Sequence, residues 1–301
     1  MTDVQIIDVS PRDGLQSEHK VLPTQVKVDL IGRLADAGVR ELEATSFVNP
    51  KKVPQMADAV EVIAGVKAAN IDVQQIGLAL NVRGAERAIE AGVDEVGFVL
   101  VSTDTFSQRN QGAPVARSIE VWHEIHALCR AANVRCNVLI ASAFGCPFEG
   151  EVSAEHVLQL ADQLLATPPD TFGVADSIGV GVPVQMKAVI APLAKTLGDI
   201  PLRCHLHDTR NTGIANALTA IEHGATRIDA STGGIGGCPF APAATGNIAT
   251  EDLLYALQRS GIACAVDLDK TIATAGWLAE QLEHDVPSSL LRAGGFPKKV
   301  A

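Results

Sequence analysis

A strand-like run of apolar residues followed by an amphipathic stretch recurs along this chain, and this repeat constrains the fold more than any other feature. The junctions between successive units, ADAGVRELEA, EAGVDEVGFV, AANVRCNVLI and EHGATRIDAS, share one pattern. A glycine or asparagine closes the helical stretch at a position that suits positive φ, and a β-rich run follows at once. The repeat therefore predicts strands and helices that alternate along one parallel sheet.

Eight such units fit within the chain. Strands are predicted at 4–9, 39–45, 73–79, 95–101, 134–140, 171–175, 201–206 and 227–231. Helices are predicted over 24–37, 53–66, 82–91, 118–131, 153–166, 183–197, 212–223 and 250–260. Eight βα units without a low-complexity linker predict an α/β fold, a closed (β/α)₈ TIM barrel, with a doubly wound open sheet as the alternative.

The barrel is expected to span about residues 4–260 of a single domain that covers 1–301. Residues 261–301 are predicted to add an extra C-terminal helical segment, with a helix over 267–282 and then a polar tail. A chain of this length with 47% hydrophobic residues has enough apolar surface to bury a large core.

Composition excludes several partners. The net charge of -11 lacks the basic face that a nucleic-acid partner requires. No run of about 20 apolar residues occurs, so no membrane contact is expected. The N-terminus resembles neither a signal peptide nor a transit peptide. The six cysteines form no CxxC pair, which is typical of a reducing compartment, and we expect a cytoplasmic protein.

Charged and polar residues gather where the predicted strands end. In a barrel these carboxyl ends meet at one rim, where active sites lie. The spacing of His205 and His207 puts both imidazoles on one face of an extended chain, because side chains alternate across a strand. Each residue alone is more often a solvated charge or an ion pair, but six at one rim favour a site that could hold a metal ion: Arg12, Asp13, Glu43, Asp176, His205 and His207.

The glycine-rich segment 231–247 follows the last predicted strand. So many small residues predict a mobile loop whose tip is able to close over a site. It carries neither GxxxxGK[ST] nor a dinucleotide fingerprint. Cys238 is its one reactive side chain, unless it is only a small hydrophobe folded under the loop. Asn247 could cap the following helix or supply an oxygen to a metal.

Six motifs together resemble the 3-hydroxy-3-methylglutaryl-CoA lyase family, over about residues 5–275. They are PRDGLQSE, ELEATSFVNPKKVPQM, FGCPFEG, DSIGVGVP, HLHDT and GGIGGCPFAPAATGNIATEDL. The most diagnostic is the GGIGGCPFA loop, since the wider superfamily of Claisen-type synthases and aldolases shares the RDG and HxH elements without this cysteine loop.

The resemblance implies a divalent cation held by Asp13, His205, His207 and Asn247. Oxygen and imidazole ligands suit Mg²⁺ or Mn²⁺, and the ligand types also allow Zn²⁺. Arg12 corresponds to the arginine beside the developing enolate, and Cys238 to the thiol that protonates it. Glu43 and Asp176 match acids that orient the substrate hydroxyl. Asp13 and His205 both remain open as the general base.

The implied reaction is cleavage of 3-hydroxy-3-methylglutaryl-CoA to acetyl-CoA and acetoacetate, a step of leucine degradation. Family members are commonly homodimers, and we expect the same here. Where the usual lyases carry Tyr-Gly after HDT, this chain has Arg210 and Asn211, which leaves the acyl chain open. The candidate contacts to the acyl-CoA are Gln16, Lys20, Asn110 and Arg210.

Three other functions are alternatives. One is a lyase for a related acyl-CoA, either citramalyl-CoA or a 3-hydroxy-3-alkylglutaryl-CoA. Another is a Claisen-type synthase or a 2-oxo acid aldolase, against which the cysteine loop argues. The last is a barrel that binds metal without catalysis, which the intact set of reactive residues disfavours.

Overall fold

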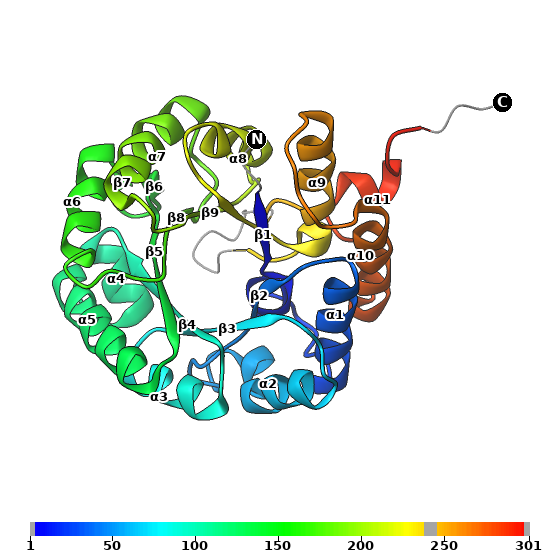
Figure 1. Ribbon diagram of the computed structural model, residues 1–301, viewed down its shortest axis with the longest axis horizontal. Coiled ribbons are helices and arrows are strands. Elements are labelled where there is room, and N and C mark those ends of the chain that lie inside the picture. Colours follow the sequence, from blue (N-terminus) through cyan, green and yellow to red (C-terminus); the bar gives the residue numbers. More distant parts are fainter. Residues whose placement is uncertain (1–3, 238–245, 298–301) are drawn as a thin grey trace.

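Eight parallel strands close into a barrel in this computed structural model, which describes residues 4–237 and 246–297 (Figure 1). The order around the barrel is β1, β10, β9, β8, β5, β4, β3 and β2. Barrel strands that follow one another along the chain are therefore neighbours in the barrel. The strands are β1 (Gln5–Asp8), β2 (Glu41–Ser46), β3 (Gln74–Ala79), β4 (Glu95–Val101), β5 (Arg135–Ala141), β8 (Thr171–Asp176), β9 (Leu202–Leu206) and β10 (Arg227–Ala230). The predicted barrel is confirmed and the open sheet is wrong.

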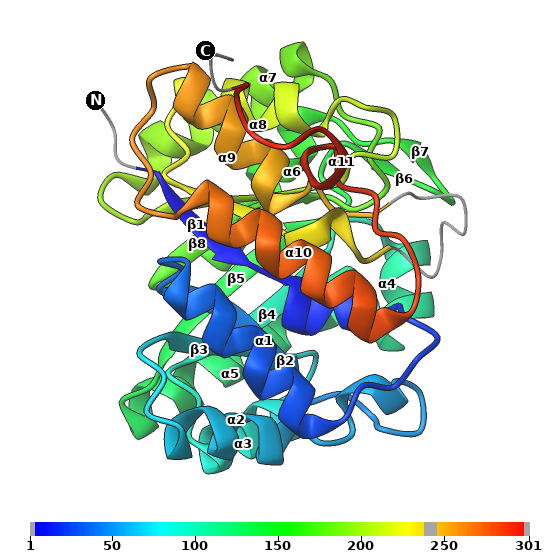
Figure 2. The same cartoon turned by 90° about the vertical axis from the view of Figure 1, so that its right-hand side faces the viewer.

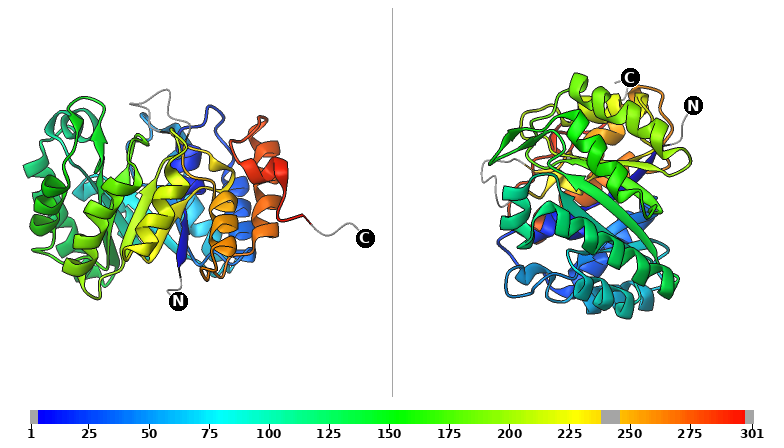
Figure 3. Two further views of the ribbon diagram at one scale, coloured as in Figure 1. Left: turned by 90° about the horizontal axis from the view of Figure 1, so that it is seen from above. Right: turned by 90° about the vertical axis from the view of Figure 1, so that its left-hand side faces the viewer.

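Helices cover the outside of these strands (Figure 3). They are α1 (Thr24–Asp36), α2 (Ala59–Ala68), α3 (Val82–Ala91), α5 (Val115–Ala132), α6 (Ala154–Leu164), α7 (Pro183–Leu197), α8 (Gly213–Glu222) and α9 (Thr250–Arg259). The residues expected to close helices at positive φ do so, at Gly38, Gly92, Asn133 and Gly224. This left-handed turn is what aims the chain back into the next strand.

The second helix begins later than predicted. Pro54–Met56 form a separate 3-10 turn, η2, and α2 starts only at Ala59. The apolar residues of the 53–66 stretch belong to both elements, since Met56 packs in the core as Val62 and Ile63 do. A periodic apolar pattern therefore did not separate a turn from the helix that follows it.

Two short helices and one hairpin were not predicted. Helix α4 (Asp104–Gln111) lies between β4 and α5, and the strands β6 (Gly145–Cys146) and β7 (Gly150–Glu151) form an antiparallel hairpin after β5. The ring of Phe106 on α4 packs edge to face against Phe148 in the hairpin turn. The other helix is α11 (Ser289–Ala293), in the stretch expected to be a polar tail.

The extra C-terminal helical segment is confirmed. Helix α10 (Leu268–Leu282) lies beside α1 and α9 on the outside of the barrel (Figure 2). Its apolar face, with Ala275 and Leu278, is buried against them. None of the described helices is long and apolar enough to cross a membrane.

The strands turn apolar side chains outward to the helices and many polar ones inward. Along β9, Cys204 and Leu206 join the core under the helices, whereas Arg203 and His205 line the pocket inside the barrel. Alternation of side chains along an extended strand produces this division. On strands β4 and β8, the inward positions Gly97 and Gly173 carry no side chain, which leaves space inside the barrel.

Candidate active site

A π-helical turn directly after β1, η1 (Ser10–Gly14), carries the first two site residues. Arg12 and Asp13 are adjacent on this turn, and all five of its residues are buried. π-Helical turns are rare and occur frequently at functional sites, because the extra residue per turn redirects side chains. Here the turn holds a guanidinium and a carboxylate together over the end of β1.

Strand β9 and the segment after the glycine-rich loop supply the remaining ligand candidates. His207 pairs with Asn247 in an isolated antiparallel bridge, and the amide of Ile248 donates to the carbonyl of Leu206 at 3.1 Å. Gly246 precedes Asn247 with φ of 99°, and a side chain at Gly246 would collide with the backbone of Gly236. Backbone pairing therefore brings Asn247 to the histidines.

Asp13, His205 and His207 meet in one buried cluster. The Nε2 atoms of the two histidines lie 3.2 Å apart. Oδ2 of Asp13 lies 3.8 Å from Nε2 of His205 and 3.9 Å from Nε2 of His207. Among the described residues, these three form a group whose side-chain atoms are close enough together to hold one metal ion. The predicted Asp-His-His grouping is therefore brought together in space.

Asp229 on β10 fixes the orientation of His205. Its carboxylate accepts a hydrogen bond from Nδ1 of His205 at 3.0 Å, so the Nε2 lone pair faces the cluster. Burial opposes protonation, but the hydrogen bond to Asp229 and the charge of Asp13 raise the pKa of His205. A carboxylate behind a metal-binding histidine is a common arrangement, because it sets both the tautomer and the direction of the ring.

The donor set fits a divalent cation. The ligand atoms of the cluster lie 3.2 to 3.9 Å apart, a span that a single ion can bridge at a metal–ligand distance of about 2.1 Å. Asn247 adds an amide oxygen, Oδ1, that is buried and has no hydrogen-bond partner among the described residues. Asn247 does not cap α9, whose N-cap is Ala249. Its Nδ2 donates to Oδ2 of Asp13 at 2.9 Å, so the amide lies against the cluster.

Arg12 links the cluster to Glu43, which lies within β2. Its Nη1 donates to Asp13 at 2.5 Å, while Nε donates to Glu43 at 2.6 Å and Nη2 forms an ion pair with it. Burial alone would raise the pKa of Asp13, but attraction by Arg12 and the nearby histidines holds it well below its usual range. Asp13 is therefore ionised at neutral pH, as a metal ligand must be.

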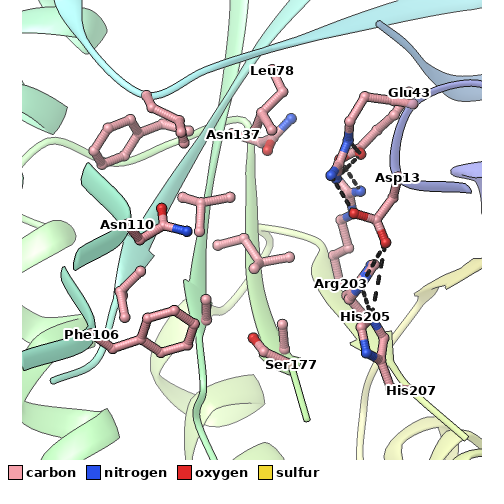
Figure 4. A pocket seen from close by; sticks show the side chains of 18 of the residues that line it. Asp13, Glu43, Leu78, Phe106, Asn110, Asn137, Ser177, Arg203, His205 and His207 are labelled. Carbon is pink, nitrogen blue, oxygen red and sulfur yellow. Dashed lines mark hydrogen bonds and ion pairs between the residues drawn. The ribbon is translucent and has the colours of Figure 1, made fainter. Parts of the chain in front are cut away.

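These residues form one wall of a pocket of about 160 Å³ at the mouth of the barrel. Figure 4 shows Asp13, Glu43, Arg203, His205 and His207 on one side and the side chains of Leu78, Phe106, Asn110, Asn137 and Ser177 across from them. The far wall is largely apolar, with contributions from β3, β4, β5 and α4. One wall is therefore charged, and the other is suited to an aliphatic group.

The remaining predicted residues fall in different places. Asn110 lines the pocket, and Gln16 donates to Asp13 at 2.9 Å. Lys20 instead pairs with Glu283 at 2.7 Å beside the end of α10, and Arg210 donates to the carbonyls of Ile178 and Gly179. Neither of these two cations lines the described pocket.

Asp176 stabilises the turn that follows β8. It accepts hydrogen bonds from the amides of Val180 and Gly181 at 3.0 and 2.8 Å, and burial raises the pKa of its carboxyl. This holds the loop that leads from β8 to α7. Cys238 lies outside the described residues.

Two buried charged residues beside the metal-ligand cluster, Arg203 and Asp229, were not predicted from the sequence. Arg203 precedes His205 by two positions, so the same alternation that pairs the histidines predicts that it also faces inward. Asp229 stands beside His205 in the register of β10 and β9. Alternation was the signal for Arg203, whereas Asp229 depends on a strand register that the sequence does not state.

Fold and site together define a class: a parallel (β/α)₈ barrel with an aspartate, two histidines and an arginine at the carboxyl ends of its strands. The family model described as HMGL-like matches residues 3–277. A hydroxymethylglutaryl-CoA lyase from Gallus gallus is 37% identical over 96% of this chain and 97% of its own length. An (R)-citramalyl-CoA lyase from Chloroflexus aurantiacus is 38% identical over 100% of this chain and 98% of its own length.

A solved structure described as an HMG-CoA lyase from Acinetobacter baumannii, in complex with coenzyme A and 3-methylmalate, superimposes with a TM-score of 0.94. It is 38% identical to this chain and covers 99% of it and 97% of its own chain. This chain belongs to the HMGL-like family. It is a carbon–carbon lyase.

Proposed function

We propose that this enzyme cleaves 3-hydroxy-3-methylglutaryl-CoA to acetyl-CoA and acetoacetate with a bound Mg²⁺ or Mn²⁺. The observation that carries the proposal is the buried Asp13, His205 and His207 cluster with Arg12 in direct contact. Mg²⁺ and Mn²⁺ favour oxygen-rich ligand sets, and Zn²⁺ remains an alternative because two ligands are imidazoles. The ion would be held by Asp13, His205, His207 and Asn247.

The reaction removes the proton of a tertiary hydroxyl and breaks the adjacent C–C bond. A divalent ion, when bound, lowers the cost of that deprotonation at neutral pH. Asp13 or His205 takes the proton. The hydroxyl carbon becomes the carbonyl of acetoacetate, and the bonding electron pair passes to the thioester as an enolate.

Arg12 is proposed to stabilise that enolate. Of its five N–H groups, one each on Nη1 and Nη2 remains beyond those that face Asp13 and Glu43. Such donors, fixed in place before the reaction, stabilise charge that develops only in the transition state. Glu43 holds the guanidinium by its Nε edge, so its proposed role is to orient Arg12 as well as the substrate hydroxyl.

Cys238 is proposed to protonate the enolate carbon and so release acetyl-CoA. Asp176 is proposed to act through the loop that it holds. Gln16 and Asn110, which lie at the pocket, are proposed to contact the acyl portion, and Lys20 and Arg210 the coenzyme portion farther out.

A second substrate, (R)-citramalyl-CoA, is favoured by the charge balance of the pocket. Both arginines that line the described pocket, Arg12 and Arg203, are already paired with carboxylates. Among the described residues that line the pocket, no unpaired cation is available to bind the distal carboxylate of 3-hydroxy-3-methylglutaryl-CoA. In citramalyl-CoA the carboxylate is attached to the hydroxyl-bearing carbon, as in the 3-methylmalate bound by the Acinetobacter relative.

The proposal is tested by incubating the purified enzyme with Mg²⁺ and each CoA ester, and by mass detection of both products. We expect acetyl-CoA from 3-hydroxy-3-methylglutaryl-CoA together with acetoacetate. Pyruvate released faster from (R)-citramalyl-CoA would select the second substrate, and larger 3-hydroxy-3-alkylglutaryl-CoA esters test the apolar wall. Absence of acetyl-CoA with every ester would refute the function.

The setting is proposed from the same family. We propose a homodimer and a place in leucine degradation, where this substrate is consumed. A cytoplasmic location is proposed because the six cysteines of the sequence form no CxxC pair, and because Cys129, Cys136, Cys146 and Cys204 are buried free thiols. Growth of a deletion strain on leucine, together with fractionation of the tagged protein, tests pathway and location.

A further inference from the structure

Arg203 is among the largest fully buried side chains of the described structure, and it lies at the heart of the site. Its guanidinium binds Asp229 through two hydrogen bonds of 2.6 Å, from Nε and from Nη2. Nη2 also donates to Glu43 at 2.6 Å. The side chains of Arg203 and Asp229 are each only 1% exposed, so this arrangement is sealed from solvent.

Each of these carboxylates orients a different part of the active site. Asp229 accepts from Nδ1 of His205 and thereby aims Nε2 of that ring at the metal-ligand cluster. Glu43 accepts from Nε of Arg12. Among the described residues, Arg203 is the one side chain that donates hydrogen bonds to both Asp229 and Glu43.

The contacts form a closed circuit of alternating charge. Asp13 contacts Arg12, which contacts Glu43, and Arg203 then joins Glu43 to Asp229 and so to His205. Nε2 of His205 returns to Asp13 at 3.8 Å. Three carboxylates face two guanidiniums, which leaves one net negative charge before a divalent ion binds and one net positive charge afterwards, suited to an anionic enolate.

Only an arginine satisfies this geometry. A planar guanidinium presents parallel N–H groups to one carboxylate while a terminal nitrogen reaches a second one. A lysine keeps the charge but offers a single point donor. Loss of the charge would leave Glu43 and Asp229 as buried carboxylates with less compensation, which is costly in a site of low dielectric.

We infer that Arg203 is a positioning residue that holds the metal-binding imidazole of His205 and the guanidinium of Arg12 in register through Asp229 and Glu43. It acts on metal affinity through Asp229 and on turnover through Glu43. The second effect rests on the proposed function, whereas the first needs no substrate.

The test compares Arg203→Met and Arg203→Lys with the wild type by calorimetric titration of Mn²⁺ into the metal-free protein. We expect Arg203→Met to weaken Mn²⁺ binding by roughly 10-fold to 100-fold, the usual cost of losing the support behind a metal ligand. At saturating Mn²⁺ it should also lower kcat more than it changes KM. Arg203→Lys should give values between those of the wild type and of Arg203→Met, because lysine keeps the positive charge but lacks the paired N–H groups of the guanidinium.

The matched control is Lys27→Met, which removes another buried cation from an ion pair, with Asp58, away from the site. It should lower thermal stability while leaving Mn²⁺ affinity and kcat unchanged. If Arg203→Met behaves like this control, Arg203 is merely structural and the inference is wrong.

A second pair of variants keeps the test decisive if Arg203→Met does not fold. Asp229→Asn retains an acceptor for His205 but loses the ion pair with Arg203. In a double-mutant cycle with Arg203→Lys, the losses in Mn²⁺ affinity should be clearly less than additive. Additive losses would show that the two residues act separately and would overturn the inference. A missing CoA-ester activity would refute the proposed function but leave this metal-binding result standing.

Discussion

The guanidinium of Arg12 is held on two sides before any substrate arrives, by Asp13 and by Glu43. Replacement by glutamine keeps a polar side chain but removes the fixed charge. We predict that Arg12→Gln lowers kcat by about 10³ and changes KM by less than tenfold, since the charge acts chiefly on the transition state. Steady-state kinetics at saturating Mg²⁺ give both constants.

An exposed arginine provides the comparison for that variant. Arg117 pairs only with Glu120 and Glu124 on its own helix, so Arg117→Gln should leave both constants unchanged. A loss for Arg12→Gln confined to KM would assign Arg12 to substrate binding instead of to the enolate.

Cysteine reactivity separates Cys238 from the other thiols. Cys204 is fully buried on the helix-facing side of β9, and burial raises the pKa of its thiol, so it should resist thiol reagents. We predict that Cys238→Ser lowers turnover by about 10², because a hydroxyl is a far weaker acid. Peptide mapping after labelling with iodoacetamide, with and without a CoA ester, identifies the reactive residue.

The half-buried Cys264 is the control for this substitution. It lines a separate cavity with Val4 and Gln5 at the opposite end of the barrel. Cys264→Ser should retain full turnover. Full turnover in Cys238→Ser as well would leave the protonation step to water or to another group.

At the scale of elements, Glu251 in the first turn of α9 binds the start of the glycine-rich segment 231–247. Both of its carboxylate oxygens accept from the amide of Gly233 at 3.1 Å, in the turn η3 (Thr232–Gly234), and its side chain also bonds to Ser288. Burial raises the pKa of Glu251 to about 7 from an ordinary value of 4.5. The folded state therefore favours the protonated acid.

This shift makes a prediction about pH. Because the pKa is raised on folding, the contribution of Glu251 to stability is present below pH 4.5 and is lost as the pH rises through 7. We predict that the free energy of unfolding of the wild type falls by about 3 kcal/mol relative to Glu251→Gln between pH 4.5 and 8. Urea unfolding of the metal-free proteins measures this difference, and a constant difference across this range would contradict it.

The sequence predicted the elements that have strong patterns. All eight barrel strands lie within two residues of their predicted limits, because buried parallel strands are apolar runs and every barrel helix except α6 ends within two residues of a positive φ. Helix α4 was missed because its sequence, DTFSQRNQ, buries only Phe106 and Ser107 and so carries no apolar stripe. The hairpin of β6 and β7 has two-residue strands, too short for any periodicity.

Some features of the site were predictable from the sequence and others were not. Asp13 follows β1, and His205 and His207 lie at and just after the end of β9. The ends of these strands must meet at one rim, so the proximity of the three residues was predictable. The π-helical turn that aims Arg12 was not, since nothing in SPRDG distinguishes it from an ordinary turn. The bridge that brings Asn247 to His207 joins residues forty positions apart through backbone hydrogen bonds alone.

At the scale of the whole molecule, helices α10 and α11 cover α1 and α9 from outside the barrel. We predict a homodimer in solution, with a mass of about twice 31.5 kDa by light scattering. A single species near 31.5 kDa across micromolar concentrations would contradict it.

The central claim is that one divalent ion, bound by the Asp13, His205 and His207 cluster, is required for C–C cleavage. The most direct measurement is a calorimetric titration of Mn²⁺ into chelator-treated protein, with acetyl-CoA release followed on matched samples. We predict one ion per chain, activity proportional to occupancy, and at least tenfold weaker binding in His207→Ala but not in His126→Ala, a half-buried histidine on α5. Full activity in the presence of chelator, or unchanged Mn²⁺ affinity in His207→Ala, would contradict the account.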